Sequence, residues 1–163
     1  PEIKTFTCPI TGKQAWAVPA AKPDAVVIHA WRADKYGNVQ IQERSMLPQY
    51  LNVDMARACR NLIVTVEEIV DTEVIKRSPQ LTLIPAFRTA AVCLVPHGSH
   101  PTATVACTEE DGTHFETYVA ASDSSEHFDA YLDEYIRGTK DFSAYLEKIG
   151  KAHLKELEVA AHV

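Results

Sequence analysis

The chain has 163 residues (18.1 kDa), of which 46% are hydrophobic and 23% are charged. These values are typical of one soluble domain with a substantial core, and they exclude disordered, collagen-like and coiled-coil proteins. The formal net charge is −6 and the 16 basic residues are scattered, which excludes nucleic acid and anionic membranes as expected partners, because phosphate binding needs clustered lysine and arginine.

Cysteine usage points to a reducing compartment. Cys8, Cys59, Cys93 and Cys107 form no C-x-x-C pair, and no signal peptide is recognisable, so we expect reduced thiols and a cytoplasmic location. Cys93 lies in an apolar run, which predicts a buried thiol. No apolar run approaches the roughly 20 residues of a membrane-spanning helix. The chain starts at Pro1 instead of Met, so we expect a piece of a longer protein.

The first half of the chain alternates strand and helix patterns. Residues 1–20 predict a turn between short extended segments, and the unbroken apolar run 25–31 predicts a strand buried on both faces. A turn at residues 35–38 leads to a hairpin return strand at 39–42. A helix is predicted over residues 51–61 and a second buried strand over 62–66.

A third strand region is predicted over residues 84–87 and 90–95. The alternation of buried strands with a helix indicates an α/β domain with an open, mostly parallel sheet flanked by helices. We treat residues 1–163 as a single domain of this class.

A helical tail is predicted over about residues 124–163. Ser124 and Asp141 are expected to begin two of its helices, and Gly138 and Gly150 to end them. The apolar stripe of such a tail must be covered, so we expect it to pack on the sheet of this chain or on a second protein chain.

Two charged groups near the predicted strand ends are candidate functional residues. Glu67 and Glu68 follow the strand 62–66, and side chains at the carboxyl ends of parallel strands line the ligand crevice of open sheets. They could share acid–base work, or one could cap a helix while the other forms an ion pair. Arg32 could clamp a carboxylate or phosphate, or pair with Asp34 and shape the hairpin.

The histidines divide into one core candidate and two loop candidates. His29 lies in the middle of an apolar strand and is interpreted as a hydrogen-bonded core residue. His97 and His100 lie in the loop Pro96-His-Gly-Ser-His-Pro101, which could orient a carboxylate or hold a metal. A metal would need a third ligand, and neither His114 nor Glu109 has a diagnostic spacing. We therefore expect a structural or substrate-facing loop and no metal.

Four segments together carry a resemblance to a known family: residues 23–40, 62–71, 84–87 with 96–101, and 131–150. Their order and spacing resemble the A subunits of the two-subunit CoA-transferases, most closely those of glutaconate CoA-transferases. The similarity runs from about Phe6 to Ile149 and corresponds to the C-terminal half of such an A subunit. His97 stands where the family has a tyrosine, which leaves the acyl group open.

The resemblance implies transfer of CoA from an acyl-CoA to a carboxylic acid, for example a dicarboxylic acid such as glutaconic acid. The intermediate is a glutamyl-CoA thioester on the partner chain, CoA is a substrate, and no cofactor is permanently bound. The family's nucleophile lies in a Ser-Glu-Asn-Gly-like setting that is absent here, since Ser125-Glu126-His127 does not match. We therefore expect no catalytic residue on this chain, and Arg32, Glu67, His97 and His100 as substrate-pocket candidates.

The implied partners are the CoA-transferase B subunit and the N-terminal half of the A subunit, in a hetero-oligomer, and the isolated chain is expected to be inactive. Two alternatives remain open. The first is a component of a CoA-ester hydrolase that acts in steroid-ring degradation with water as acceptor. The second is a non-catalytic assembly module, which should expose an apolar edge where the other half packs.

Overall fold

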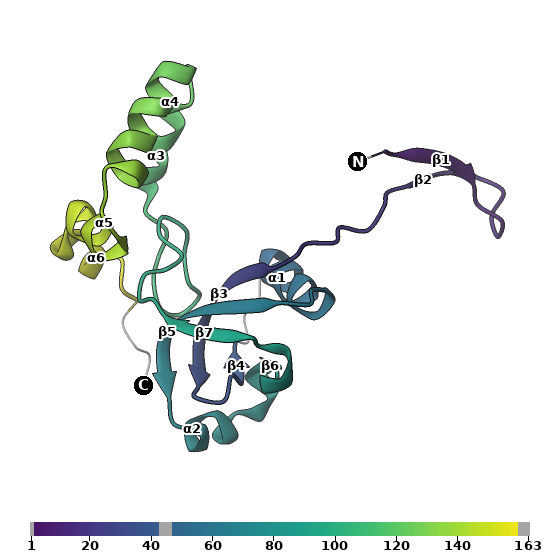
Figure 1. Ribbon diagram of the computed structural model, residues 1–163, viewed down its shortest axis with the longest axis horizontal. Coiled ribbons are helices and arrows are strands. Elements are labelled where there is room, and N and C mark those ends of the chain that lie inside the picture. Colours follow the sequence, from purple (N-terminus) through teal and green to yellow (C-terminus); the bar gives the residue numbers. More distant parts are fainter. Residues whose placement is uncertain (1, 43–46, 160–163) are drawn as a thin grey trace.

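The structure, a computed structural model, describes residues 2–42 and 47–159, and only the backbone of residues 47–51. Its main body is a five-stranded sheet in the order β6-β4-β3-β5-β7, accompanied by helices (Figure 1). The α/β fold predicted from the sequence is confirmed. The sheet is mixed, because parallel and antiparallel pairs each make up half of its strand pairs.

Three parallel strands form one side of the sheet. β3 (Val26–Asp34) pairs with β5 (Leu62–Val70), and β5 pairs with the edge strand β7 (Ala91–Leu94). The second predicted strand continues four residues beyond its expected end, since β3 and β5 stay in register as far as Asp34 and Val70. Glu67 and Glu68 therefore lie inside a strand and not after it.

The other side of the sheet is antiparallel. The predicted hairpin is confirmed: β4 (Val39–Gln40) returns along β3 after a turn in which the Asp34 carboxylate accepts the backbone N–H groups of Tyr36 and Asn38. Gly37 has φ +94°, a conformation that glycine adopts without strain. β6 (Thr82–Ile84) follows α2 (Thr72–Arg77) and the short turn η1 (Pro79–Leu81), and pairs with β4. The expected third strand region is therefore two strands at opposite edges of the sheet.

One face of the sheet packs against α1 (Leu47–Ala58). This helix begins four residues before the predicted start at residue 51 and ends three residues before the predicted end at residue 61. Val53, Ala56 and Cys59 form the core there together with alternate residues of the central strands. Arg88, in the short turn η2 (Ala86–Arg88), donates to the carbonyl oxygens of Ala56 and Cys59 at 3.2 and 2.8 Å. A cation is thereby held at the carboxyl end of α1, where the helix dipole favours it.

The opposite face is covered only in part. Val27, Ile63 and Ala91 stand in register across three neighbouring strands, yet Val27 is 63% exposed, Ile63 is half-buried and Ala91 is exposed. Cys93 on the same face is exposed as well. The predictions of a β3 buried on both faces and of a buried Cys93 thiol are therefore wrong within this chain. An apolar run indicates that both faces of a strand are suited to burial. It does not indicate whether the elements that bury them belong to the same chain.

The helical part begins at Gly112, earlier than the tail predicted from about residue 124. It comprises α3 (Gly112–Ala121), α4 (Ser125–Leu132), η3 (Asp133–Arg137), α5 (Phe142–Ile149) and α6 (Lys151–Glu156). Ser124 and Asp141 cap α4 and α5 as predicted, each accepting a backbone N–H at the third helical position. Gly138 and Gly150 follow the ends of η3 and α5, also as predicted.

The apolar stripe of these helices packs mainly on itself. Figure 1 shows α3 and α4 side by side, pointing away from the sheet. Aromatic rings contact one another in series here, with neighbouring ring centroids 4.9–5.8 Å apart: Phe128, Tyr118, Tyr131 and Tyr135. The expectation that this stripe lies on the sheet is wrong, because the aromatic side chains of neighbouring helices cover one another.

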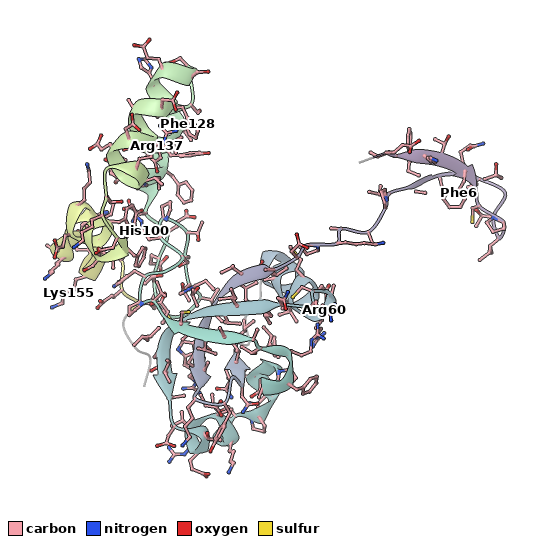
Figure 2. All side chains as sticks on the ribbon, viewed as in Figure 1. Phe6, Arg60, His100, Phe128, Arg137 and Lys155 are labelled. Atoms are coloured by element: carbon pink, nitrogen blue, oxygen red, sulfur yellow. The ribbon has the colours of Figure 1, made fainter. Side chains whose placement is uncertain are left out.

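A separate hairpin precedes the sheet. β1 (Lys4–Thr7) and β2 (Gln14–Ala17) form the turn with extended flanks that the sequence predicts. An extended segment separates this hairpin, which carries Phe6, from the main body (Figures 1 and 2). Trp16 is 73% exposed. Within the described residues, we find no helix that has the length and apolarity to cross a bilayer.

Candidate functional site

The loop that follows β7 folds back over the two central strands. We call residues 95–108 the pocket loop. Its anchor is the Glu67 carboxylate of β5, whose side chain is 11% exposed. One oxygen, Oε1, is 2.8 Å from His29 Nε2 on β3 and 3.1 Å from the Thr104 hydroxyl. The other, Oε2, accepts the backbone N–H of His97 at 2.8 Å.

These donors keep Glu67 ionised. Burial alone would raise the pKa of this carboxyl, but the hydrogen bonds from His29, His97 and Thr104 hold the pKa below its ordinary value. Burial, together with the charges of Glu67 and Glu68, raises the pKa of the nearby Cys107 thiol to about 12. Cys107 is therefore protonated at neutral pH and is a poor nucleophile. Glu67 acts as an anchor for the loop, with both of its oxygens engaged.

His29 is hydrogen-bonded, as predicted for a core histidine, but it also belongs to the site. Its Nδ1 lies 2.8 Å from the Thr65 hydroxyl, so both ring nitrogens have partners. The ring lies under Gly98 of the pocket loop. A Cβ on Gly98 would stand 2.7 Å from the His29 ring and from the Val95 carbonyl oxygen. Only glycine allows the loop to approach this closely.

Gly98→Ala is therefore expected to lower the free energy of unfolding by about 2 kcal/mol, because either the ring or the loop must shift. Urea denaturation followed by circular dichroism measures the change. Gly112→Ala is the control, since a Cβ there meets no atom within 4 Å. Equal losses in the two variants would contradict the close packing of loop and ring.

A cavity of about 180 Å³ lies beside this cluster. Its polar lining residues are His29, Gln42, Asn52, Ser99, Thr102 and Thr104. The other described side chains that line it are uncharged and mostly apolar. We call this cavity the Ser99 pocket, and none of the four residues predicted as pocket candidates lines it.

The two loop histidines point to different partners. His97 has φ +59°, which turns its backbone N–H toward Glu67, while its ring Nε2 is 3.7 Å from Glu158. That ring lines a second cavity of about 420 Å³, between the pocket loop and the helices α5 and α6. His100 is bonded through Nδ1 to the Tyr145 hydroxyl at 2.6 Å and is buried. The sequence suggested one shared role for the pair, and the structure separates them.

His100 belongs to a buried cluster around Asp111. Asp111 Oδ2 lies 3.0 Å from His100 Nε2 and 2.7 Å from His153 Nε2, and Oδ1 accepts the His114 N–H. Burial alone would raise the pKa of Asp111, but these hydrogen bonds lower it to about 2. Figure 2 shows His100 where the pocket loop meets the helical part. The cluster therefore ties the loop to α3 and α6.

The chain beyond α6 adds a second tie to the pocket loop. Glu109 N–H donates to the Leu157 carbonyl at 2.7 Å, and Val159 N–H donates to the Cys107 carbonyl at 2.9 Å. Thr108 and Glu158 form an antiparallel bridge between these contacts. Together with the His153–Asp111 bond, they hold the pocket loop from its outer side.

Arg32 lies in β3 and not in a loop. Its guanidinium stacks on Trp31 at 3.7 Å, donates to Gln40 Oε1 at 2.8 Å and lies 3.9 Å from Glu68. The alternative pairing with Asp34 is wrong, because the carboxylate of Asp34 is engaged by the backbone and side chain of Asn38. Arg32 is thus placed to fix the sheet, outside the Ser99 pocket.

Sequence reasoning missed Ser99 and Thr104. Ser99 stands in the recognised loop motif, so its position between His97 and His100 was the available signal. Thr104 is 8% exposed and contacts Glu67 across 37 positions of sequence, which no local pattern reports. Across residues 2–42 and 47–159, no three His, Cys, Asp or Glu side chains are grouped so as to hold a metal ion.

Comparison with known proteins agrees with this architecture. The chain is 42% identical over 153 residues to the A subunit of 3-oxoadipate CoA-transferase of Pseudomonas knackmussii, covering 93% of this chain and 51% of that protein. It is 35% identical over 148 residues to the A subunit of glutaconate CoA-transferase of Acidaminococcus fermentans, covering 91% and 45%. The chain thus spans about half the length of these two curated relatives.

The fold has the same relatives. The crystal structure of glutaconate coenzyme A-transferase from A. fermentans superimposes with a TM-score of 0.85 and 34% identity, over 98% of this chain and 50% of that one. The family described as coenzyme A transferase matches residues 4–94, which include the hairpin, the sheet and Glu67. The resemblance found in the sequence is therefore confirmed, and the chain belongs to the coenzyme A transferase family.

Proposed function

We propose that this chain forms the C-terminal part of the A subunit of a two-subunit CoA-transferase that moves CoA from an acyl-CoA to a carboxylic acid. The names of its relatives, which refer to 3-oxoadipate and glutaconate, support a dicarboxylic acid as the acid substrate. All four cysteines are free, which supports a cytoplasmic location.

The proposed reaction uses a glutamate carboxylate of the B subunit. It attacks the thioester carbonyl and expels the CoA thiolate, which leaves an acyl-glutamyl anhydride. The thiolate then attacks the glutamyl carbonyl, forms glutamyl-CoA and releases the first acid. The acceptor carboxylate and the thiolate repeat these two steps in the opposite direction, which yields the new acyl-CoA and restores the glutamate.

The state of Glu67 is the observation that carries this proposal. It is the buried carboxylate of the candidate site, and both of its oxygens accept hydrogen bonds within the chain. A carboxylate held by three donors, with a lowered pKa, is stabilised as an anchor and weakened as a nucleophile. Among the described residues, no acidic side chain lines the Ser99 pocket. The reactive carboxylate is therefore expected from another chain.

The partly uncovered sheet face supports the need for further protein. The row Val27, Ile63 and Ala91 is apolar and open to solvent at both ends, and β7 is an edge strand. On the other face of that strand, Leu94 is 56% exposed. Apolar surface of this kind on a sheet favours burial by the N-terminal half of the A subunit or by the B subunit.

The experiment that tests this proposal locates the glutamate to which CoA becomes covalently attached. The chain is assembled with the N-terminal half of the A subunit, together with the B subunit, and is incubated with an acyl-CoA. Mass spectrometry of the peptides should find the CoA adduct on the B subunit and none on this chain. The chain alone, under the same conditions, should form no adduct and catalyse no transfer.

An adduct on the peptide that contains Glu67, or turnover by the isolated chain, would contradict the proposal. Release of CoA at the same rate without an acceptor acid would instead identify the hydrolase alternative. An assembled complex that neither forms an adduct nor releases CoA would identify the assembly-module alternative.

A further inference from the structure

The Ser99 hydroxyl has its single proton engaged inside the chain. Its oxygen lies 2.6 Å from the Thr104 hydroxyl and 3.0 Å from the Thr102 carbonyl oxygen. A hydroxyl has one proton to donate and two lone pairs to accept with. The Ser99 proton therefore has two acceptors within hydrogen-bond distance in the pocket loop itself.

Glu67 sets the direction of the hydrogen bonds. Thr104 lies between Ser99 and the ionised carboxylate, and an anion accepts and cannot donate. The favourable order is therefore donation from Ser99 to Thr104 and from Thr104 to Glu67. If Ser99 instead donates to the Thr102 carbonyl, its proton is still used within the loop. In both arrangements a molecule in the pocket meets lone pairs at Ser99.

No described lysine or arginine lines the pocket. Both nitrogens of the His29 ring are engaged by Thr65 and Glu67, so neither is left to bind a molecule in the pocket. The Thr102 hydroxyl also donates its proton internally, to the Ser99 carbonyl. A carboxylate placed against Ser99 would face the lone pairs of its hydroxyl, with the charge of Glu67 on the far side of Thr104. The amide groups of Gln42 and Asn52, elsewhere in the lining, carry no charge to offset this. An uncharged group that donates a hydrogen bond fits this lining.

Building on the proposed function, we infer that the Ser99 pocket holds an uncharged amide segment of the CoA substrate, of the pantetheine kind, and does not hold a carboxylate of the acid. The Ser99 oxygen accepts the amide N–H of that segment. The Glu67–Thr104 pair acts as a positioning device, because it keeps the Ser99 lone pairs turned to the pocket. Glu67 thereby influences which end of the substrates enters, without touching them.

The test uses the 163-residue chain labelled with ¹⁵N and two probes at equal concentration: pantetheine, kept reduced, and glutarate. Pantetheine is expected to shift the backbone amide signals of Ser99, Ala103 and Thr104 in a saturable manner, while glutarate leaves them in place. Saturable shifts with glutarate would overturn the inference. The absence of shifts with both probes up to about 20 mM, the range in which weak fragments bind, would overturn it as well.

Ser99→Ala should weaken pantetheine binding about fivefold, because one net hydrogen bond is lost. Ser143→Ala is the matched control, since Ser143 is an exposed serine that lines the second cavity instead. Equal affinity in wild type and Ser99→Ala would overturn the assignment of the acceptor to Ser99.

The inference and the proposed function can fail separately. Binding is measured on this chain without turnover, whereas the adduct experiment needs the assembled enzyme. An enzyme that transfers CoA although its Ser99 pocket ignores pantetheine would overturn the inference alone. Pantetheine binding in an assembly that forms no adduct on the B subunit would overturn the proposed function alone.

Discussion

Asp111→Ala is expected to lower the free energy of unfolding by about 3 kcal/mol. Asp111 is 2% exposed, and its two oxygens accept from the His100 and His153 rings and from the His114 backbone. Without the carboxylate, the buried His100 ring, the half-buried His153 ring and the first turn of α3 lose their partner. Urea denaturation at pH 7 measures the loss.

An exposed aspartate–histidine pair provides the matched control. Asp123 Oδ1 lies 2.7 Å from His127 Nδ1, the same distance as in the Asp111–His153 contact, but both side chains are more than 60% exposed. Asp123→Ala should therefore cost less than about 0.5 kcal/mol. Similar losses in the two variants would show that burial of the Asp111 cluster does not matter.

The same cluster predicts an acid-sensitive component of stability. The pKa of Asp111 falls from its ordinary 3.8 to about 2 on folding, so the folded state favours the ionised form. A lowered pKa contributes stability that is complete above about pH 4 and is lost as the pH falls toward 2. This component, about 2 kcal/mol, should be absent from the pH profile of Asp111→Ala.

The second large effect is expected for Glu67→Gln, which should lower the free energy of unfolding by about 2 kcal/mol. Glutamine keeps the shape of the side chain but replaces one acceptor oxygen with an NH₂ donor. If the NH₂ group faces His97, it opposes a backbone N–H, and if it faces His29 and Thr104, the Thr104 hydroxyl loses its acceptor. In either orientation a buried donor loses the carboxylate oxygen that accepts it. The amide signals of residues 97–104 should broaden or shift in the ¹⁵N spectrum.

Glu68→Gln separates the anchor role from the charge. Glu68 is the neighbouring glutamate in β5, its side chain is 47% exposed, and its ion pair with Arg32 is long, at 3.9 Å. The same change in charge there should cost less than about 0.5 kcal/mol and leave the loop signals in place. Unchanged loop signals in Glu67→Gln would contradict the anchor.

The local features of the chain could be predicted well from its sequence. Ser124 and Asp141 cap their helices, and the hairpin after Asp34 forms, because each depends on contacts between residues close in sequence. The burial of Val27 and Cys93 could not be predicted in this way. Their apolar pattern is that of a buried surface, yet no element among the described residues covers them.

The site depends on distant contacts, which is why sequence reasoning found its parts and not their arrangement. Glu67 was singled out, but its role follows from Thr104 and His97, at least 30 positions away along the chain. His29 was interpreted as a core residue because its strand is apolar, although the loop above it makes it part of a pocket. A motif can indicate which residues belong to a site. Which hydrogen-bond donor meets which acceptor is decided only when the folded backbone brings distant residues together.

The contacts that the segment after α5 makes with the pocket loop have a consequence for biosynthesis. Residues 95–108 receive contacts from His153, Leu157 and Val159, directly or through Asp111 and Glu109. On the ribosome the sheet can form while these residues are still untranslated, since domains fold as their parts emerge. The Ser99 pocket is therefore expected to mature later than the sheet, after residues 153–159 of the nascent polypeptide have left the exit tunnel.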